Sequence, residues 1–269
     1  MFTFIHHQHL PLLKQLRLPF MTAVQLRDPF IENKRVHRPN SNQPLSDSEF
    51  SEAMAKSYEA LEPHIKAMVT FEYYLKQAKQ NREQIEKQIQ RPKTPKQLGL
   101  ASLESYEKVV CLRLFKQIYQ QGLWQTAGMQ HEAVAIKLDA QHPFLAGKQF
   151  EQRPQLLTPV IYDDSRPPLP SKADPFPALL RRPEHLAYEQ ESRLIRPSAV
   201  MDKVIDEMLT CKFPKGLIQG MYVGLACPES VVESLHALVT QDLNFRGVPL
   251  KQIGVSATHL RLVATDVML

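Results

Sequence analysis

The sequence is poor in glycine and tryptophan and contains no long apolar run. Its 269 residues include 9 glycines and 1 tryptophan. The absence of a glycine-rich phosphate-binding loop and of a Gly-x-Ser-x-Gly turn argues against kinases, Walker-type NTPases and serine hydrolases. No apolar run approaches the roughly 20 residues of a membrane helix, and no secretory signal pattern is evident. The sequence therefore predicts a cytoplasmic protein with no membrane partner.

Cysteine and net charge are limited as well. Cys111, Cys211 and Cys227 are odd in number and lie among apolar residues, which is typical of thiols in the core of a reduced, intracellular chain. The formal net charge is +5, and basic residues are mixed with acidic ones along the chain. This balance permits an acidic ligand such as a dinucleotide, but it does not predict binding to duplex DNA.

The apolar pattern predicts an α+β fold, with one domain over residues 1–269 built on a mixed, largely antiparallel sheet. The segment "VVCLRLF" is apolar on both faces, which predicts a central strand. In "LLTPVIYDD", Pro159 removes a backbone donor and so indicates an edge strand. The segments 197–209 and 228–243 have the apolar spacing of helices. Composition and periodicity lead no further than this fold class.

Residues 46–108 are predicted to form a helical hairpin inserted into the domain. Ser46 and Glu49 have the spacing of a capping box, and Pro63 should divide the helix that follows. Residues 70–90 are rich in Lys, Glu and Gln, so this part of the insertion is expected to face solvent and to offer a surface for a protein partner.

Two groups of aromatic and histidine residues have competing interpretations. His6, His7 and His9 lack the helical spacing of a zinc site, so we predict polar residues at the end of a strand and no metal. Trp124 is interpreted mainly as a core residue because it buries a large area. The alternative places it in the wall of a ligand pocket, with His131 as a polar contributor.

The segment "HLAYEQESRLI", residues 185–195, allows two geometries. In a helix, Glu189 and Arg193 would form an ordinary surface ion pair. In a strand, Glu189, Glu191 and Arg193 would line one face. Two neighbouring carboxylates separate each other's pKa values, and a carboxylate beside a ribose can stabilise an oxocarbenium-like transition state. Ion-pair ladders that only brace a sheet have the same sequence pattern.

Several segments together resemble a widespread bacterial family, domain of unknown function number twenty-nine seventy-one, over about residues 1–265. The segments that carry the resemblance fall in the family's order: "FTFIHHQHL", "LRDPFIE", "VVCLRLF", "GLWQTAGMQHEAVAIKLD", "VIY" and "HLAYEQESRLI". The chain departs from the family pattern at Arg27 in place of Asn, at Ile31 inside the turn motif, at Arg113 in place of a frequent Ser, and at Leu186 in place of Trp.

The family's layout in turn looks like that of ADP-ribosyltransferases, which implies an ADP-ribosyltransferase-like fold and NAD as the substrate. By this resemblance Glu191 is the expected catalytic carboxylate and Glu189 activates the acceptor. The resemblance also implies that His6 or His7 contacts NAD, with Tyr162 as a further contact. Trp124, His131 and Arg193 complete the expected binding residues.

Two functions are therefore expected as alternatives. The first is an NAD-dependent ADP-ribosyltransferase or NAD glycohydrolase, acting on a macromolecule or water in bacterial toxin action or phage defence. The second is a non-catalytic interaction or sensor protein, in which the glutamates brace a sheet and the helical insertion binds a partner. An open cleft shared by the glutamates and the His6 region would favour the enzyme, whereas carboxylates capped by arginines on a convex surface would favour the binding protein.

Overall fold

The computed structural model divides the chain into two compact units, and each is described by itself. The first unit comprises Met1–Glu32 and Ala101–Leu269, and the second, here called the helical unit, comprises Asn33–Leu100. The structure describes residues 1–32, 45–89, 101, 103–145, 149–150, 153–154 and 157–267. Helices and a mixed, largely antiparallel sheet confirm the predicted α+β class.

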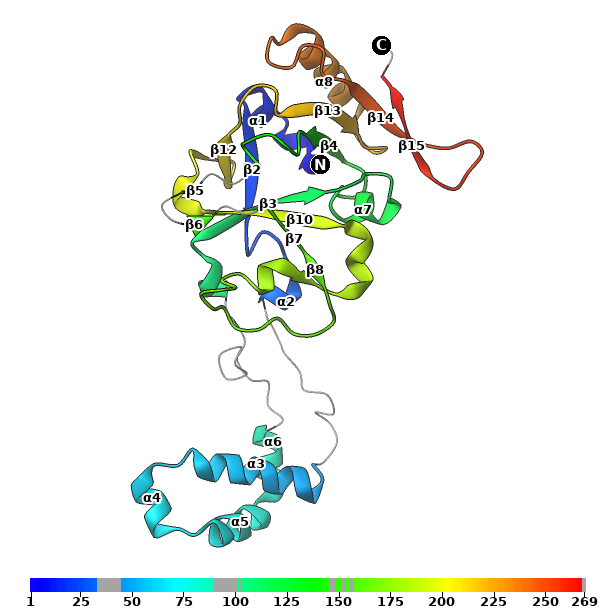
Figure 1. The fold of residues 1–269 in the computed structure, drawn as a ribbon. Coiled ribbons are helices and arrows are strands. Elements are labelled where there is room, and N and C mark those ends of the chain that lie inside the picture. The colour runs from blue at the N-terminus through cyan, green and yellow to red at the C-terminus, as the bar shows by residue number, and fades with distance from the viewer. Residues whose placement is uncertain are drawn as a thin grey trace. The chain divides into compact units, whose positions relative to one another are not determined.

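The first unit is built on an 11-stranded sheet (Figure 1). Its strands are β1 Phe2–His6, β2 Arg17–Thr22, β3 Val109–Phe115, β4 Ala133–Leu138, β7 Leu157–Pro159, β10 Glu191–Pro197, β11 Lys203–Ile205, β12 Met208–Lys212, β13 Ile218–Val223, β14 Leu250–Val255 and β15 Leu262–Asp266. Two small ribbons pair β5 Gln149–Phe150 with β6 Arg153–Pro154, and β8 Ile161–Tyr162 with β9 Arg181–Arg182. Among the described strands of the large sheet, only β13 and β14 pair in parallel.

Short helices connect these strands. The α-helices of the first unit are α1 Pro11–Lys14, α2 Pro29–Glu32, α7 Gln121–Thr126 and α8 Glu229–Gln241. Its 3-10 helices are η1 His7–His9, η3 Leu103–Tyr106, η4 Ala178–Leu180, η5 Glu184–Glu189 and η6 Ser198–Val200. The apolar face of α8 packs into the main core beside β13 and β14, which confirms the helix predicted over 228–243.

Strand β3 is the central strand that the sequence predicts, and the sheet branches at it. On one side β3 pairs with β10 along its whole length. On the other side Phe115 pairs with Phe2 of β1, while Cys111 pairs with Met21 of β2. One branch therefore continues through β1, β4, β13, β14 and β15, and the other through β2, β12 and β11. The predicted edge strand is also confirmed, because β7 pairs with β10 alone among the described strands.

The two faces of β3 and β10 bury different chemistry. Leu112, Leu114 and Leu194 point into the main hydrophobic core. Cys111 and Ile195, on the opposite face, pack in a smaller apolar cluster with Tyr106 and Leu179. Because side chains alternate along a strand, this second face also carries Arg113, Glu191 and Arg193. The charged residues thus lie on the face of the sheet opposite the main hydrophobic core.

The helix predicted over residues 197–209 is wrong. The segment contains η6, then β11 and β12, joined as a hairpin with a two-residue turn. Asp206 and Glu207 both have positive φ, of 48° and 63°, as a type I′ hairpin turn requires. Met201, Val204, Ile205 and Met208 happen to have helical spacing, but β-branched residues and pairing of β12 with β2 favour a strand.

The part of the helical unit that the structure describes, residues 45–89, contains four helices: α3 Asp47–Glu59, α4 Pro63–Met68, α5 Phe71–Gln80 and α6 Arg82–Ile89. The capping box at Ser46 and Glu49 is confirmed, and α4 begins at Pro63, where the sequence predicts a break. Two further breaks divide the expected hairpin, at the Thr70 cap and at Asn81. Of the insertion predicted over 46–108, residues 90–100 and 102 lie outside the described residues, and η3 packs in the first unit.

No helix within the described part of the chain is long and apolar enough to cross a bilayer.

Candidate functional site

The register of β3 and β10 sets two arginines directly opposite each other. Arg113 pairs with Arg193, and both belong to the face that also carries Glu191. Like charges in directly opposed positions destabilise a sheet. The Arg193 side chain is 2% exposed and that of Arg113 is 18% exposed, so water screens neither charge well. A counter-charge between the two guanidinium groups is therefore required.

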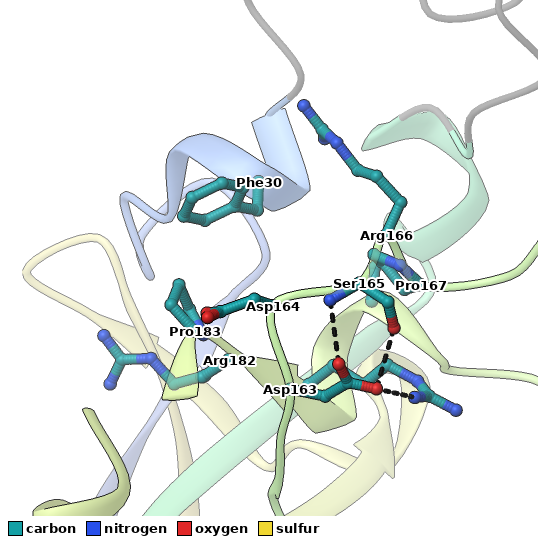
Figure 2. Close-up of a pocket in the computed structure, with 10 residues that line it drawn as sticks. Phe30, Asp163, Asp164, Ser165, Arg166, Pro167, Arg182 and Pro183 are labelled. Carbon is teal, nitrogen blue, oxygen red and sulfur yellow. Dashed lines mark hydrogen bonds and ion pairs between the residues drawn. The ribbon is translucent and has the colours of Figure 1, made fainter. Parts of the chain in front are cut away.

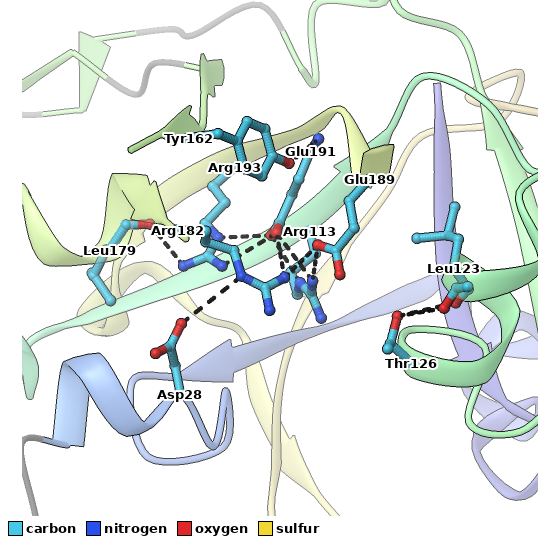
Figure 3. Close-up of polar contacts among 11 residues, drawn as sticks. Asp28, Arg113, Leu123, Thr126, Tyr162, Leu179, Arg182, Glu189, Glu191 and Arg193 are labelled. Atoms are coloured by element: carbon cyan, nitrogen blue, oxygen red, sulfur yellow. Dashed lines mark hydrogen bonds and ion pairs between the residues drawn. The ribbon is translucent and has the colours of Figure 1, made fainter. Parts of the chain in front are cut away.

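Glu191 supplies this counter-charge (Figure 3). Its Oε1 accepts hydrogen bonds from Nε of Arg193 at 2.7 Å and from Nε of Arg113 at 2.8 Å. Its Oε2 accepts a second bond from each guanidinium, at 3.2 Å and 3.0 Å. Each arginine thus holds the carboxylate with two parallel bonds, which is the strongest geometry for such a pair. Arg193 also donates to the carbonyl of Leu179, so it is fixed at both ends.

Glu189 reaches the same cluster by a different backbone path. It is the last residue of η5, and Gln190 follows with φ of 45° before β10 begins at Glu191. The segment 185–195 is therefore neither one helix nor one strand, although Glu191 and Arg193 share a strand face as the strand interpretation requires. Glu189 Oε2 accepts from Arg113 at 3.2 Å and from Arg182, whereas Oε1 is buried with no hydrogen-bond partner among the described residues.

Arg182 and Asp28 complete the cluster. Arg182 Nη1 lies 3.4 Å from Glu191 Oε2, and Arg182 Nε lies 3.9 Å from Oδ2 of Asp28. Asp28 is buried at the turn before α2, where its other oxygen accepts from the backbone N–H of Phe30. Three guanidinium groups consequently face three carboxylates, and the cluster is close to neutral.

The environments of the two glutamates shift their pKa values in opposite directions. Burial raises the pKa of Glu189, and the attraction of Arg113 and Arg182 only partly offsets this effect. For Glu191 burial acts in the same sense, but Arg113 and Arg193 outweigh it and hold the pKa well below the usual range of a glutamate. A pair of carboxylates with separated pKa values is a common arrangement for proton transfer.

Tyr162, one of the predicted site residues, lies at this cluster. Its hydroxyl oxygen accepts a hydrogen bond from the backbone N–H of Glu191 at 2.8 Å. Burial raises the pKa of Tyr162. This bond satisfies the first N–H of β10 where the chain leaves Gln190, so Tyr162 fixes the start of the strand that carries Glu191.

A cavity of about 220 Å³ lies against the arginine side of the cluster. Its lining comprises Leu26, Arg27, Asp28, Pro29, Phe30, Arg113, Arg182, Pro183, His185, Leu186 and Arg193. A neighbouring cavity of about 90 Å³ shares Phe30, Arg182 and Pro183 with it and adds Asp163, Asp164 and Ser165 (Figure 2). Glu189 and Glu191 line neither cavity, whereas their partners Arg113, Arg182 and Arg193 line the larger one.

The remaining predicted site residues lie elsewhere. Trp124 is fully buried, packs edge-on against Phe4 with ring centroids 4.9 Å apart, and lines neither cavity. This agrees with the core interpretation. His131 stacks on Trp124, and burial lowers its pKa. His6 and His7 contact Glu132 and not the two central glutamates.

Three members of the cluster, Arg113, Arg182 and Asp28, are not predicted as site residues from the sequence. A signal existed for Arg113, since a single charged residue in an otherwise apolar central strand needs a buried partner. Arg113 stands where the resemblance leads us to expect a serine, and it bonds both predicted glutamates.

Comparisons with protein-family models, with curated proteins and with solved structures gave no match for this chain. The function must therefore be argued from the geometry of the cluster and its cavity.

Proposed function

We propose that the protein binds NAD at the arginine-lined cavity and cleaves the bond between nicotinamide and ribose, as an ADP-ribosyltransferase or NAD glycohydrolase. The observation that carries the proposal is the pair of glutamates with oppositely shifted pKa values, placed directly behind a cavity lined by four arginines. Guanidinium groups bind phosphate oxygens in a two-pronged geometry, so the pyrophosphate of a dinucleotide suits this cavity.

Ligand binding would uncover the carboxylate of Glu189 by exchange of partners. Arg182 Nε is buried with no hydrogen-bond partner among the described residues, and its Nη1 reaches both glutamates. In this proposal phosphate oxygens replace Glu189 Oε2 as the partner of Arg182, and Glu189 then faces the ribose. Glu191 stays between Arg113 and Arg193, where it stabilises the positive charge that develops on the sugar.

The proposed reaction balances without a further reagent. The bond between the nicotinamide nitrogen and the anomeric carbon breaks, and its electron pair leaves with nicotinamide. An oxygen of water, or of a macromolecular acceptor, bonds to the anomeric carbon and releases one proton. Glu189 is the candidate proton acceptor, since a general base is most effective with a pKa raised toward the working pH. The protein would act in the cytoplasm, as an effector of a toxin or phage-defence type.

The test is to incubate the purified full chain with NAD and to measure nicotinamide and ADP-ribose by chromatography, with labelled NAD and lysate to detect transfer. Glu189→Gln should lower the rate about 100-fold or more. Glu184→Gln, on an exposed residue of the same η5 helix, is the matched control and should behave like wild type. If the wild type neither consumes NAD nor labels any component, the proposal is wrong.

A second candidate function is a non-catalytic interaction or sensor protein. One observation favours it: Glu189 and Glu191 are 0% and 2% exposed and are capped by arginines, as expected of a brace within the sheet. The partner would then bind the helical unit, where Met68 and Tyr73 are 83% and 57% exposed. Under this alternative NAD is not consumed, and Tyr73→Ser weakens partner binding whereas Glu189→Gln does not.

A further inference from the structure

A second polar cluster lies at the opposite end of β1 from the arginine and glutamate cluster. Phe115 of β3 pairs with Phe2 of β1 on one side and with Glu191 of β10 on the other. His6 lies four residues beyond Phe2 along β1, so it is roughly 13 Å from Phe2. At that end His6 pairs with Ala133, which places the residue before Ala133, Glu132, next to the two histidines. One ring nitrogen of His6, one of His7 and a carboxylate oxygen of Glu132 all lie within 4.8 Å of one another.

The position of Glu132 is set by an unusual piece of backbone. The three residues before it, Met129, Gln130 and His131, all have positive φ, of 49°, 57° and 69°. Non-glycine residues rarely adopt this region, and three in succession are unfavourable unless other contacts hold them. The carbonyl of Glu132 is fixed by the Cys227 thiol, whose Sγ lies 3.1 Å from it. The loop is therefore held in a shape that carries the Glu132 side chain to the histidines.

The hydrogen bond of His7 orients its ring so that one nitrogen can bind a cation. His7 donates from Nδ1 to the carbonyl oxygen of Glu132 at 3.0 Å, which leaves the Nε2 lone pair of His7 available. A bond from the non-ligating ring nitrogen to a carbonyl is the usual way in which metal-binding histidines are oriented. His6 Nε2 lies 3.4 Å from Glu132 Oε2. Donor atoms bound to one tetrahedral Zn²⁺ are separated by about 3.4 Å, given bond lengths of about 2.0–2.2 Å.

We propose that His6, His7 and Glu132 form a binding site for a divalent transition-metal ion of the Zn²⁺ class. Two imidazoles and one carboxylate suit such an ion, and they leave a fourth position for water. On binding, the ring proton of His6 moves from Nε2 to Nδ1, and the long 3.3 Å contact from the Gln8 N–H to Nδ1 is lost. The spacing of the histidines alone predicts no metal, because the third ligand is 126 residues away in the sequence.

The test is a Zn²⁺ titration of the full chain in competition with a chromophoric chelator. The wild type should bind one equivalent at micromolar concentration or below, and His7→Gln and Glu132→Gln should each weaken binding at least ~10-fold. His9→Gln is the matched control: it lies in the same η1 helix, with its ring 6.3 Å from that of His6, and is not one of the three ligands. Its affinity should equal that of the wild type.

Glu132→Gln should not impair folding, because the Glu132 side chain is 49% exposed and glutamine has the same size. A loss of Zn²⁺ binding in this variant therefore reports on the site itself. A second measurement follows the histidine ring nitrogens by long-range ¹H–¹⁵N NMR, where Zn²⁺ should shift one nitrogen of His6 and one of His7. The proposal is overturned if the wild type binds no Zn²⁺ under these conditions. It is equally overturned if Glu132→Gln and His7→Gln bind Zn²⁺ as the wild type does, or if the shifted signals belong to other histidines.

Discussion

Replacing Glu191 by glutamine should destabilise the first unit far more than the same change at Glu189. Glu191→Gln keeps the size of the side chain but leaves Arg113 and Arg193 opposite each other without the charge that joins them. Removal of one partner of a buried ion pair costs about 3–5 kcal/mol. For a unit of this size the expected fall in Tm is roughly 6–20 °C.

Glu189→Gln should cost only about 1 kcal/mol, the net value of an ordinary hydrogen bond. Burial already disfavours the charged form of Glu189, and Arg113 and Arg182 keep Glu191 as a partner. Urea unfolding followed by Trp124 fluorescence is the suitable assay, because this single tryptophan is buried in the first unit and does not report on the helical unit. Glu184→Gln provides the baseline.

The pH dependence adds a second criterion. The pKa of Glu189 is raised in the folded protein, so its contribution to stability is greatest at low pH and declines as pH rises from about 4.5 toward the folded pKa. Relative to wild type, Glu189→Gln should therefore gain stability as the pH rises above about 4.5, the ordinary pKa of a glutamate. The lowered pKa of Glu191 has the opposite sign: its contribution is present above about 4.5 and declines as pH falls below it. A loss in Glu189→Gln equal to that in Glu191→Gln, or one that grows with pH, would refute this reasoning.

Two further predictions concern the fold. Replacing Asp206 and Glu207 by Asn-Gly should raise stability by about 1 kcal/mol, because both positions have positive φ; a lower urea midpoint would contradict the type I′ turn. Trp124→Ala should lower the free energy of unfolding by about 3–5 kcal/mol, because the side chain is fully buried. For the same reason the fluorescence emission of Trp124 in the wild type should be blue-shifted and unaffected by NAD. Quenching of that emission by NAD would show instead that Trp124 lies in the wall of the NAD-binding pocket.

Much of the fold follows from local patterns in the sequence. The apolar run of β3 predicts a central strand correctly, and the capping box at Ser46 marks the start of α3. The hairpin of β11 and β12 is missed because its apolar residues also have helical spacing, and the turn residues Asp206 and Glu207 are not the usual Asn-Gly. Pairing with β2 decides the outcome, and such pairing between distant segments cannot be read from a local window.

The site shows the same limit. Alternation along a strand predicts that Glu191 and Arg193 share a face, and the structure agrees. The partners that set their pKa values come from distant positions: Arg113 is 78 residues from Glu191. Likewise, nothing in the sequence around His6 and His7 indicates that Glu132 is their partner, because only the pairing of β1 with β4 brings these residues together. Local patterns thus indicate which residues need partners, and the sheet register brings Arg113 and Glu132 to them.

The branching of the sheet at β3 has a consequence for how the protein is made. Strands β1 and β2 are synthesised before the helical unit, whereas β3, which pairs with both of them, is synthesised after it. The delay before pairing is longer for the branch formed by β2, β12 and β11, because Arg17 of β2 pairs with Lys212 of β12, which is synthesised much later. At about 5–20 residues per second, roughly 10–40 s separate their synthesis. During that interval the edge of β2 that later pairs with β12 is unpaired and apolar, so we expect the nascent β2 segment to bind a chaperone.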